Sequence, residues 1–84
     1  MDIEHLVKMA NQIGTFYAAM PDRKQAEADI ASHLQRFWEP RMREAFLAHV
    51  DACKASGADS GLLPIVAEMV SVHGSKLQPA RQPS

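Results

Sequence analysis

Catalysis by protein side chains needs a nucleophile, an acid–base pair or a bound metal ion, and few residues of this sequence could supply one. The histidines are His5, His33, His49 and His73, and none forms an HxxxH or HExxH pair on one helix face. His49 and Cys53 lie one helical turn apart, a spacing that permits a cysteine–histidine dyad. Packing explains both more simply, His49 as a hydrogen-bonded core or interface histidine and Cys53 as a small buried side chain. The sequence also lacks a phosphate-binding loop and a zinc-ligand spacing, so it predicts a protein that is not an enzyme and binds no metal or cofactor itself.

The segment Arg36–Arg43, RFWEPRMR, places the only tryptophan of the chain beside a phenylalanine, with arginines on both sides. One interpretation is a hydrophobic corner, in which Phe37 and Trp38 end one helix and the proline turns the chain. The other is a docking surface, because tryptophan and arginine are enriched at interface hot spots. Arg41 and Arg43 favour docking, since they fall in the first turn of a helix, where the dipole disfavours cations. We therefore predict that Phe37, Trp38, Arg41 and Arg43 contact a partner, with the simple corner as the alternative.

Two amide side chains, Asn11 and Gln12, stand in the middle of the first predicted helix. Asparagine is a poor residue for a helix interior, so amphipathic patterning does not explain its presence. We predict that both side chains hydrogen-bond backbone groups, either of a partner or of a neighbouring loop. Simple exposure to solvent is the alternative.

Composition bounds the size and setting of the protein. The 84 residues suffice for at most one domain, and 46% of them are hydrophobic, which is enough to fold. The single cysteine excludes an intrachain disulfide, and small chains without such a staple often complete their core against a partner. Nine basic and ten acidic residues give a net charge of −1, so we expect neither nucleic acid nor a membrane as partner. The acidic N-terminus does not resemble a signal peptide and no stretch is apolar enough to cross a membrane, so we expect a cytoplasmic protein.

Apolar residues at helical spacing predict the first helix. It begins after Asp2, a good capping residue. Its packed face comprises Ile3, Leu6, Val7, Ala10, Ile13, Phe16, Tyr17 and Met20. Gly14 lies one turn after Ala10 on nearly the same face, and a glycine at that place predicts a close neighbour.

Two further helices are predicted on either side of Pro40. The second helix opens at Pro21 or Asp22 and ends before Pro40, which suits the first position of the third helix. The packed face of the second helix comprises Ala26, Ile30, Ala31, Leu34, Phe37 and Trp38, and its polar face comprises Arg23, Lys24, Glu27, Asp29 and Gln35. The packed face of the third helix comprises Met42, Ala45, Phe46, His49, Val50 and Cys53.

A segment of turn-forming residues, KASGADSG from Lys54 to Gly61, predicts the main loop. Asp59 or Ser60 is expected to cap a fourth helix, in which Pro64 is tolerated because it falls in the first turn. Its packed face comprises Leu62, Ile65, Val66, Met69, Val70 and His73. The sequence thus predicts an all-α fold, with four short helices in one compact domain over residues 1–77 and a flexible polar tail over 78–84.

Three segments of the chain carry a family resemblance. They are KMANQIGTFYAAMPDR (Lys8–Arg23), IASHLQRFWEPRMREAFLAHV (Ile30–Val50) and, more weakly, GLLPIV (Gly61–Val66). The order of MANQIG, MPD and FWEPRM is specific, because generic amphipathic patterning explains none of these motifs. With these motifs the chain resembles the delta subunit of the soluble NAD-dependent formate dehydrogenases that contain molybdenum or tungsten.

The resemblance implies a small accessory subunit of a complex that oxidises formate to carbon dioxide. The molybdenum or tungsten pterin, the iron–sulfur clusters, the flavin and the use of NAD would belong to other subunits. The implied partner is the large catalytic (alpha) subunit, within a complex that also holds flavin/NAD-binding and iron–sulfur subunits. The chain would be either a resident subunit that supports assembly or stability, or a transient maturation factor that aids insertion of the molybdenum cofactor. A stand-alone regulatory binding protein is a more distant alternative.

Overall fold

The computed structural model describes residues 2–79, and every regular element in this part of the chain is an α-helix. The helices are α1 (Ile3–Tyr17), α2 (Arg23–Phe37), α3 (Pro40–Ser56) and α4 (Pro64–Leu77). The prediction of an all-α fold with four short helices is therefore confirmed. Residues 80–84 of the predicted polar tail lie outside the described residues.

Side-chain caps and prolines start the first three helices where the sequence predicts. The Asp2 carboxylate accepts a hydrogen bond of 3.0 Å from the backbone N–H of Glu4 at the start of α1. Asp22, one of the two predicted openings, caps α2 in the same way by accepting from the N–H of Gln25 at 3.2 Å. Pro40 occupies the first turn of α3, where its missing N–H leaves no hydrogen bond unmade.

The loop between α3 and α4 lies later in the chain than the predicted segment from Lys54 to Gly61. Helix α3 continues through Lys54, which was expected in the loop, and ends only after Ser56. Gly57 then stops the helix in a left-handed conformation with φ of 77°, which a residue with a side chain adopts only with strain. The loop is therefore confined to residues 57–63.

The predicted cap of α4 is wrong. Neither Asp59 nor Ser60 caps this helix, because it begins later, at Pro64, with Leu63 in the capping position and no side-chain cap. The Asp59 carboxylate instead accepts a hydrogen bond of 2.8 Å from the N–H of Gly61 within the loop. The start of α4 must therefore be held in another way.

Asn11 of α1 holds the start of α4. Its side-chain amide donates to the carbonyl oxygen of Gly61 at 2.9 Å and accepts from the N–H of Leu63 at 2.9 Å. An amide can make such a two-sided contact because it carries a donor and an acceptor side by side. Of the alternatives raised for Asn11, the structure shows a contact with a neighbouring loop.

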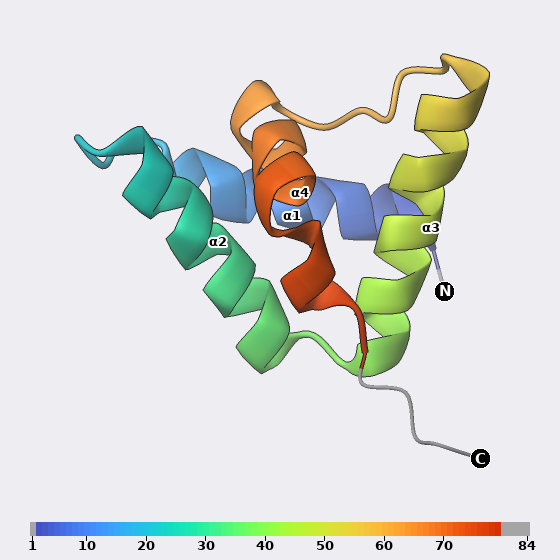
Figure 1. Cartoon of the computed structure of the whole chain (residues 1–84), viewed down its shortest axis with the longest axis horizontal. Helices are drawn as coiled ribbons and strands as arrows, with labels where there is room; N and C mark the ends of the chain where they lie inside the picture. Colours follow the sequence, from blue (N-terminus) through green and yellow to red (C-terminus); the bar gives the residue numbers. More distant parts are fainter. Residues whose placement is uncertain (1, 80–84) are drawn as a thin grey trace.

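Three of the helices form an open frame that the fourth closes on one side. Helices α1, α2 and α3 lie along different edges of the molecule, and α4 lies across the space between them (Figure 1). Helix α4 contacts all three other helices, and its largest contact is with α2. The hydrophobic core therefore lies where α4 meets the frame.

Small residues on α1 let α4 approach closely. Ala10 and Gly14 are buried, and a Cβ atom added to Gly14 would lie 2.5 Å from Cγ2 of Val66. Cγ2 of Ile65 would lie 3.4 Å from the same added Cβ atom. The close neighbour predicted at Gly14 is thus present, and it is α4.

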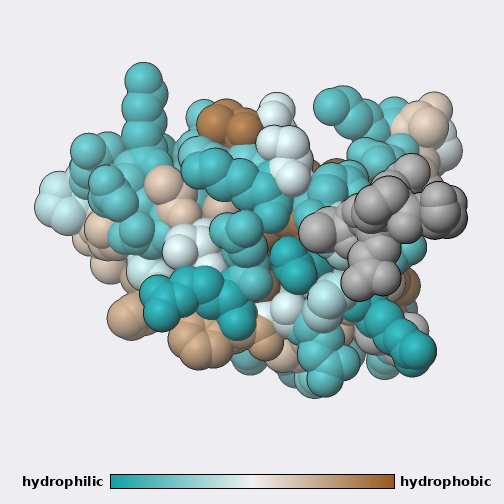
Figure 2. Space-filling model, turned by 60° about the horizontal axis from the view of Figure 1, so that its bottom comes forward, coloured by the Kyte–Doolittle hydropathy of each residue, from teal (hydrophilic) through white to brown (hydrophobic). Residues whose placement is uncertain are grey.

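The buried hydrophobic residues come from all four helices and from the corner after α2. They are Leu6, Ala10, Ala26, Ile30, Ala31, Leu34, Trp38, Phe46, Leu47, Ile65, Val66, Met69 and Leu77. Trp38 and Phe46 meet edge to face, with ring centroids 5.5 Å apart, so the RFWEPRMR segment does form a hydrophobic corner. The face shown in Figure 2 is mostly hydrophilic, with hydrophobic atoms in separate patches.

One charged residue is part of the interior. Glu27 was assigned to the polar face of its helix, and this is wrong, because only 3% of its surface is exposed. Its carboxylate lies 3.2 Å from Nε of Arg23, whose Nη2 lies 3.2 Å from the Glu68 carboxylate on α4. Burial raises the pKa of the Glu27 carboxyl above its ordinary value of 4.5; Glu68 raises it further, and Arg23 acts in the opposite direction. The three side chains link α2 to α4.

Candidate docking groove

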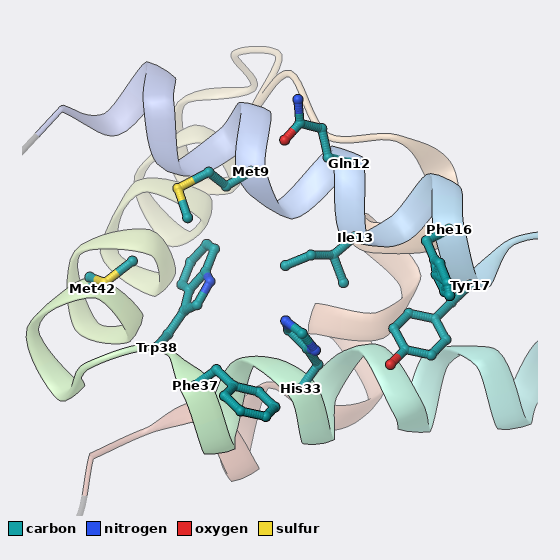
Figure 3. Close-up of a pocket in the computed structure, with 9 residues that line it drawn as sticks. All are labelled: Met9, Gln12, Ile13, Phe16, Tyr17, His33, Phe37, Trp38 and Met42. Carbon is teal, nitrogen blue, oxygen red and sulfur yellow. The ribbon is translucent and has the colours of Figure 1, made fainter.

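The frame of helices is open on the side away from α4. An apolar groove of about 680 Å³ lies there, between α1, α2 and the beginning of α3. It is lined by Met9, Gln12, Ile13, Phe16, Tyr17, His33, Phe37, Trp38 and Met42. In Figure 3 the ribbon of α4 passes behind these side chains, and no residue of α4 lines the groove.

Trp38 forms the inner end of this groove. Its indole ring is directed towards Met9 of α1 and stands beside Met42 of α3 (Figure 3). Only 5% of the Trp38 surface is exposed, because Phe46 covers it from the core side. Trp38 therefore belongs both to the core and to the lining of the groove, which joins the two interpretations of the corner.

Two phenylalanines stand at the mouth of the groove. Phe16 and Phe37 were predicted on packed faces, and this is wrong, because 68% and 67% of their surfaces are exposed. The reason is that both lie on the side of the frame that α4 does not cover. Each ring is held by a neighbour: Phe16 meets Tyr17 edge to face at 5.1 Å, and Phe37 lies 4.8 Å from His33. Exposed phenyl rings gathered at one groove are typical of a surface that another molecule covers.

A few polar groups accompany these apolar walls. His33 lies between Tyr17 and Phe37, with ring centroids 6.4 Å and 4.8 Å away. Gln12 is exposed at the rim on α1. Apolar walls with a small number of polar groups are the usual composition of a binding groove.

The two arginines after Pro40 point to different places. Arg41 is exposed, next to the groove residue Met42. Arg43 is half-buried, and its Nη1 donates to the carbonyl oxygen of Leu77 at 3.5 Å, where α4 ends. Its Nε is buried and has no hydrogen-bond partner within residues 2–79. Arg43 thus holds the C-terminal end of α4, whose carbonyl groups attract a cation.

The predicted contact residues are therefore only partly gathered in one place. Gln12, Phe37 and Trp38 line the groove, and Arg41 is an exposed residue that directly precedes the lining residue Met42 in the sequence. Asn11 and Arg43 make hydrogen bonds within the chain, to the loop before α4 and to its last residue.

Sequence reasoning missed most of the α1 wall as a site. Met9, Ile13 and Phe16 follow one another at four and three residues, so they share one side of the helix. Ala10 and Gly14 form a neighbouring stripe of small residues. A helix with one stripe of small residues and one stripe of large apolar residues can contact two neighbours. This pattern of α1 was the sequence signal that could have identified the groove wall.

Cys53 and His49, the possible cysteine–histidine dyad, lie close together but without a hydrogen bond directed at one ring nitrogen. Sγ of Cys53 lies 3.8 Å from both ring nitrogens of His49, so it favours neither of them. Nε2 of His49 lies 3.1 Å from the carbonyl oxygen of Ser60, which gives this half-buried histidine a hydrogen-bond partner as predicted. Among residues 2–79, no three His, Cys, Asp or Glu side chains are grouped so that they could hold a metal ion.

The fold and the groove define a small helical protein with one closed and one uncovered apolar face. A family model described as the NADH-dependent formate dehydrogenase delta subunit, FdsD, matches residues 5–70. The chain therefore belongs to the family of formate dehydrogenase delta subunits. Searches of curated proteins and of solved structures gave no match.

The match covers all of α1, α2 and α3 except the first two residues of α1, and the first half of α4. It thus includes every residue that lines the groove. A delta subunit of a formate dehydrogenase associates with other subunits of that enzyme. No helix among residues 2–79 is both long and apolar enough to span a membrane.

Proposed function

We propose that this chain is a non-catalytic accessory subunit of a cytoplasmic NAD-dependent formate dehydrogenase, which binds the large catalytic subunit and supports assembly or stability of the active enzyme. The observation that carries the proposal is the uncovered groove with Trp38 at its inner end and two exposed phenylalanines at its mouth. Membership of the formate dehydrogenase delta-subunit family indicates that the partner is another subunit of that enzyme.

The exposed rings provide a driving force of useful size. Burying a phenylalanine side chain fully contributes about 1.5–3 kcal/mol. Phe16 and Phe37 are each about two thirds exposed, so covering both contributes about 2–4 kcal/mol before the costs of association. Trp38, at the Met9 and Met42 end of the groove, adds the rigid aromatic surface that is enriched at the centres of interfaces (Figure 3).

The chemistry of formate oxidation belongs, in this proposal, to the other subunits. The molybdenum or tungsten pterin, the iron–sulfur clusters and the flavin are bound by them, and this chain binds none. Its own donor set does not fit an iron–sulfur cluster, because such clusters are held by about four cysteine thiolates and Cys53 is the only cysteine. The chain therefore acts on the partner by binding it.

The test is to purify the enzyme through a tag on the large subunit and to weigh its smallest component. We expect this chain in a fixed ratio to the large subunit after size exclusion. In cells without the chain, formate oxidation should fall, while the KM for formate of the remaining enzyme stays unchanged. Absence of the chain from the mature enzyme, together with a requirement for it during biosynthesis, would identify the transient maturation factor instead. Formate oxidation by the isolated chain would contradict the proposal outright.

A further inference from the structure

The walls of the groove limit what can occupy it. All of them are helices, whose backbone hydrogen bonds are satisfied internally, and the described residues contain no strand whose edge could pair with an extended segment. An occupant of an apolar groove must therefore bring its own satisfied backbone, since unpaired N–H and C=O groups are costly away from water. A helix meets this condition in any orientation, whereas an extended segment meets it only where its backbone groups face solvent.

The length of the groove suits about two helical turns. Its longest wall runs along α1 from Met9 to Tyr17, eight residues apart, which corresponds to about 12 Å at about 1.5 Å per residue. A helix laid against this wall meets it with apolar side chains at positions i, i+3 or i+4, and i+7.

Charges around the groove favour a particular partner. Three exposed cations, Lys8, Arg36 and Arg41, each directly precede a lining residue in the sequence, namely Met9, Phe37 and Met42. Within residues 2–79, none of the three forms an ion pair with an acidic side chain. Glu39, beside Trp38, is the corresponding exposed acid. Of the three, Arg36 contacts the groove, since its guanidinium carbon lies 5.8 Å from the centroid of the Phe37 ring. The sequence neighbours of the lining residues thus include more cations than acids, although the whole chain carries a net charge of −1.

These charges also speak against two other occupants. In a symmetric dimer the same patch would face itself, and the cationic rims of two copies would be brought together. The C-terminal segment 80–84, ARQPS, has no large apolar side chain to fill the groove and carries a cation of its own.

We propose that the groove seats one amphipathic helix of the large catalytic subunit, with apolar residues at i, i+3 or i+4, and i+7 and with carboxylates along its margins. This inference rests on the proposed function. The helix covers Phe16 and Phe37, and its carboxylates lie against Lys8, Arg36 and Arg41.

Photo-crosslinking in the assembled enzyme tests it. A benzophenone side chain is placed at Phe16, at Phe37 or, as a control, at Val72, which is 62% exposed on α4. The expected crosslinks from Phe16 and Phe37 fall on one segment of the large subunit, at residues three, four or seven apart and next to Asp or Glu. Val72 should not reach that segment. Crosslinks to an extended segment, to a second copy, to another subunit, or none from either groove position would overturn the proposal.

A charge reversal gives a second readout. The double variant R36E/R41E should weaken binding of the purified large subunit at least tenfold at low salt, and by less at high salt, because salt screens exposed charges. Lys54→Glu, an exposed cation at the far end of α3, should leave binding unchanged. Equal binding of both variants would remove the acidic margin from the proposal. If the wild-type chain does not co-purify with the large subunit, the proposed function itself fails; if it does and only Val72 crosslinks, this inference alone fails.

Discussion

The two sides of the helical frame are built from different side chains. Towards α4, α1 presents Ala10 and Gly14, which are small enough for a helix to approach until atoms touch. Towards the groove, the same helix presents Met9, Ile13 and Phe16, which are large and keep a space of about 680 Å³ between them and α2. One side is thus closed by a helix of the chain itself, and the other is an apolar groove that no helix of the described residues covers.

The comparison teaches that side-chain size, more than hydrophobicity, distinguishes the face of α1 that α4 covers from the face that lines the groove. Both faces of α1 are apolar, so a count of apolar residues does not distinguish them. The difference also divides two neighbouring aromatic residues, because Trp38 is buried in the corner while Phe37 remains exposed. The predictions below test these contrasts, beginning with the largest expected effect.

Trp38→Ala should lower the free energy of unfolding by about 3–5 kcal/mol, the usual cost of removing a large aromatic side chain from a packed site. Phe37→Ala, the matched variant one residue earlier, should stay within about 0.5 kcal/mol of the wild type, as exposed positions do. Urea unfolding followed by circular dichroism measures both. Similar losses for the two variants would mean that the two rings do not belong to different sides of the frame.

Gly14→Ala should lower the free energy of unfolding by about 2 kcal/mol. The new methyl group would lie 2.5 Å from the buried Val66 side chain, and overpacking of this kind costs about 1–3 kcal/mol or more, offset in part by better helix propensity.

Gly74→Ala is the matched control for that variant. The nearest atom to its new methyl group is 3.6 Å away, an ordinary contact, so we expect a stabilisation of about 0.5–1 kcal/mol from helix propensity alone. Changes of equal sign in the two melting curves would contradict the close approach of α1 and α4.

Asn11→Ala should lower the free energy of unfolding by about 1–2 kcal/mol, because two hydrogen bonds to the loop before α4 are lost. Amide hydrogen exchange should speed up at Leu63, whose N–H loses its acceptor. Gln12→Ala removes the neighbouring exposed amide and should leave both quantities unchanged. Unaltered exchange at Leu63 in the Asn11 variant would show that this contact does not hold the loop.

Glu27→Gln should flatten the dependence of stability on pH. Because burial raises the pKa of Glu27, the folded protein binds more protons than the unfolded chain between the ordinary and the raised value. Its contribution is therefore most favourable below about pH 4.5 and is lost as the pH rises through the raised pKa. Glu44→Gln, an exposed control on α3, should leave the slope unchanged. Urea unfolding from pH 4 upwards checks the sign, and a wild-type slope in the Glu27 variant would refute it.

Local signals in the sequence predicted much of the fold. Asp2 and Pro40 mark helix starts through hydrogen bonds and dihedral angles that involve only their neighbours. Gly14 predicted the close approach of another element to α1, because a glycine inside a helix usually serves close packing. The partner of Asn11, in contrast, lies 50 residues away in the sequence, and no local pattern identifies it.

The groove was predicted only in part for a related reason. Helical periodicity identifies an apolar side of a helix, but it does not say which neighbour covers it, so Phe16 and Phe37 were assigned to the packed faces. The charge of Glu27 predicts an exposed side chain, but its position predicts a buried one. It precedes Ile30 by three residues and Leu34 by seven, so it lies on the buried side of α2. Residue type was enough to select Phe37 and Trp38, which line the groove. The wall opposite them can be identified only from the arrangement of α1 and α2.

The most direct test of the account compares the affinity of two full-length variants for the purified large subunit. Phe37→Ala removes an exposed ring from the groove, and Val72→Ala removes an exposed apolar side chain from α4 on the other side. Both should fold like the wild type, because both positions are exposed. The account predicts that the Phe37 variant binds at least tenfold more weakly, about 1.4 kcal/mol, while the Val72 variant binds like the wild type. Equal affinities of the two variants, or a loss with Val72→Ala alone, would contradict it.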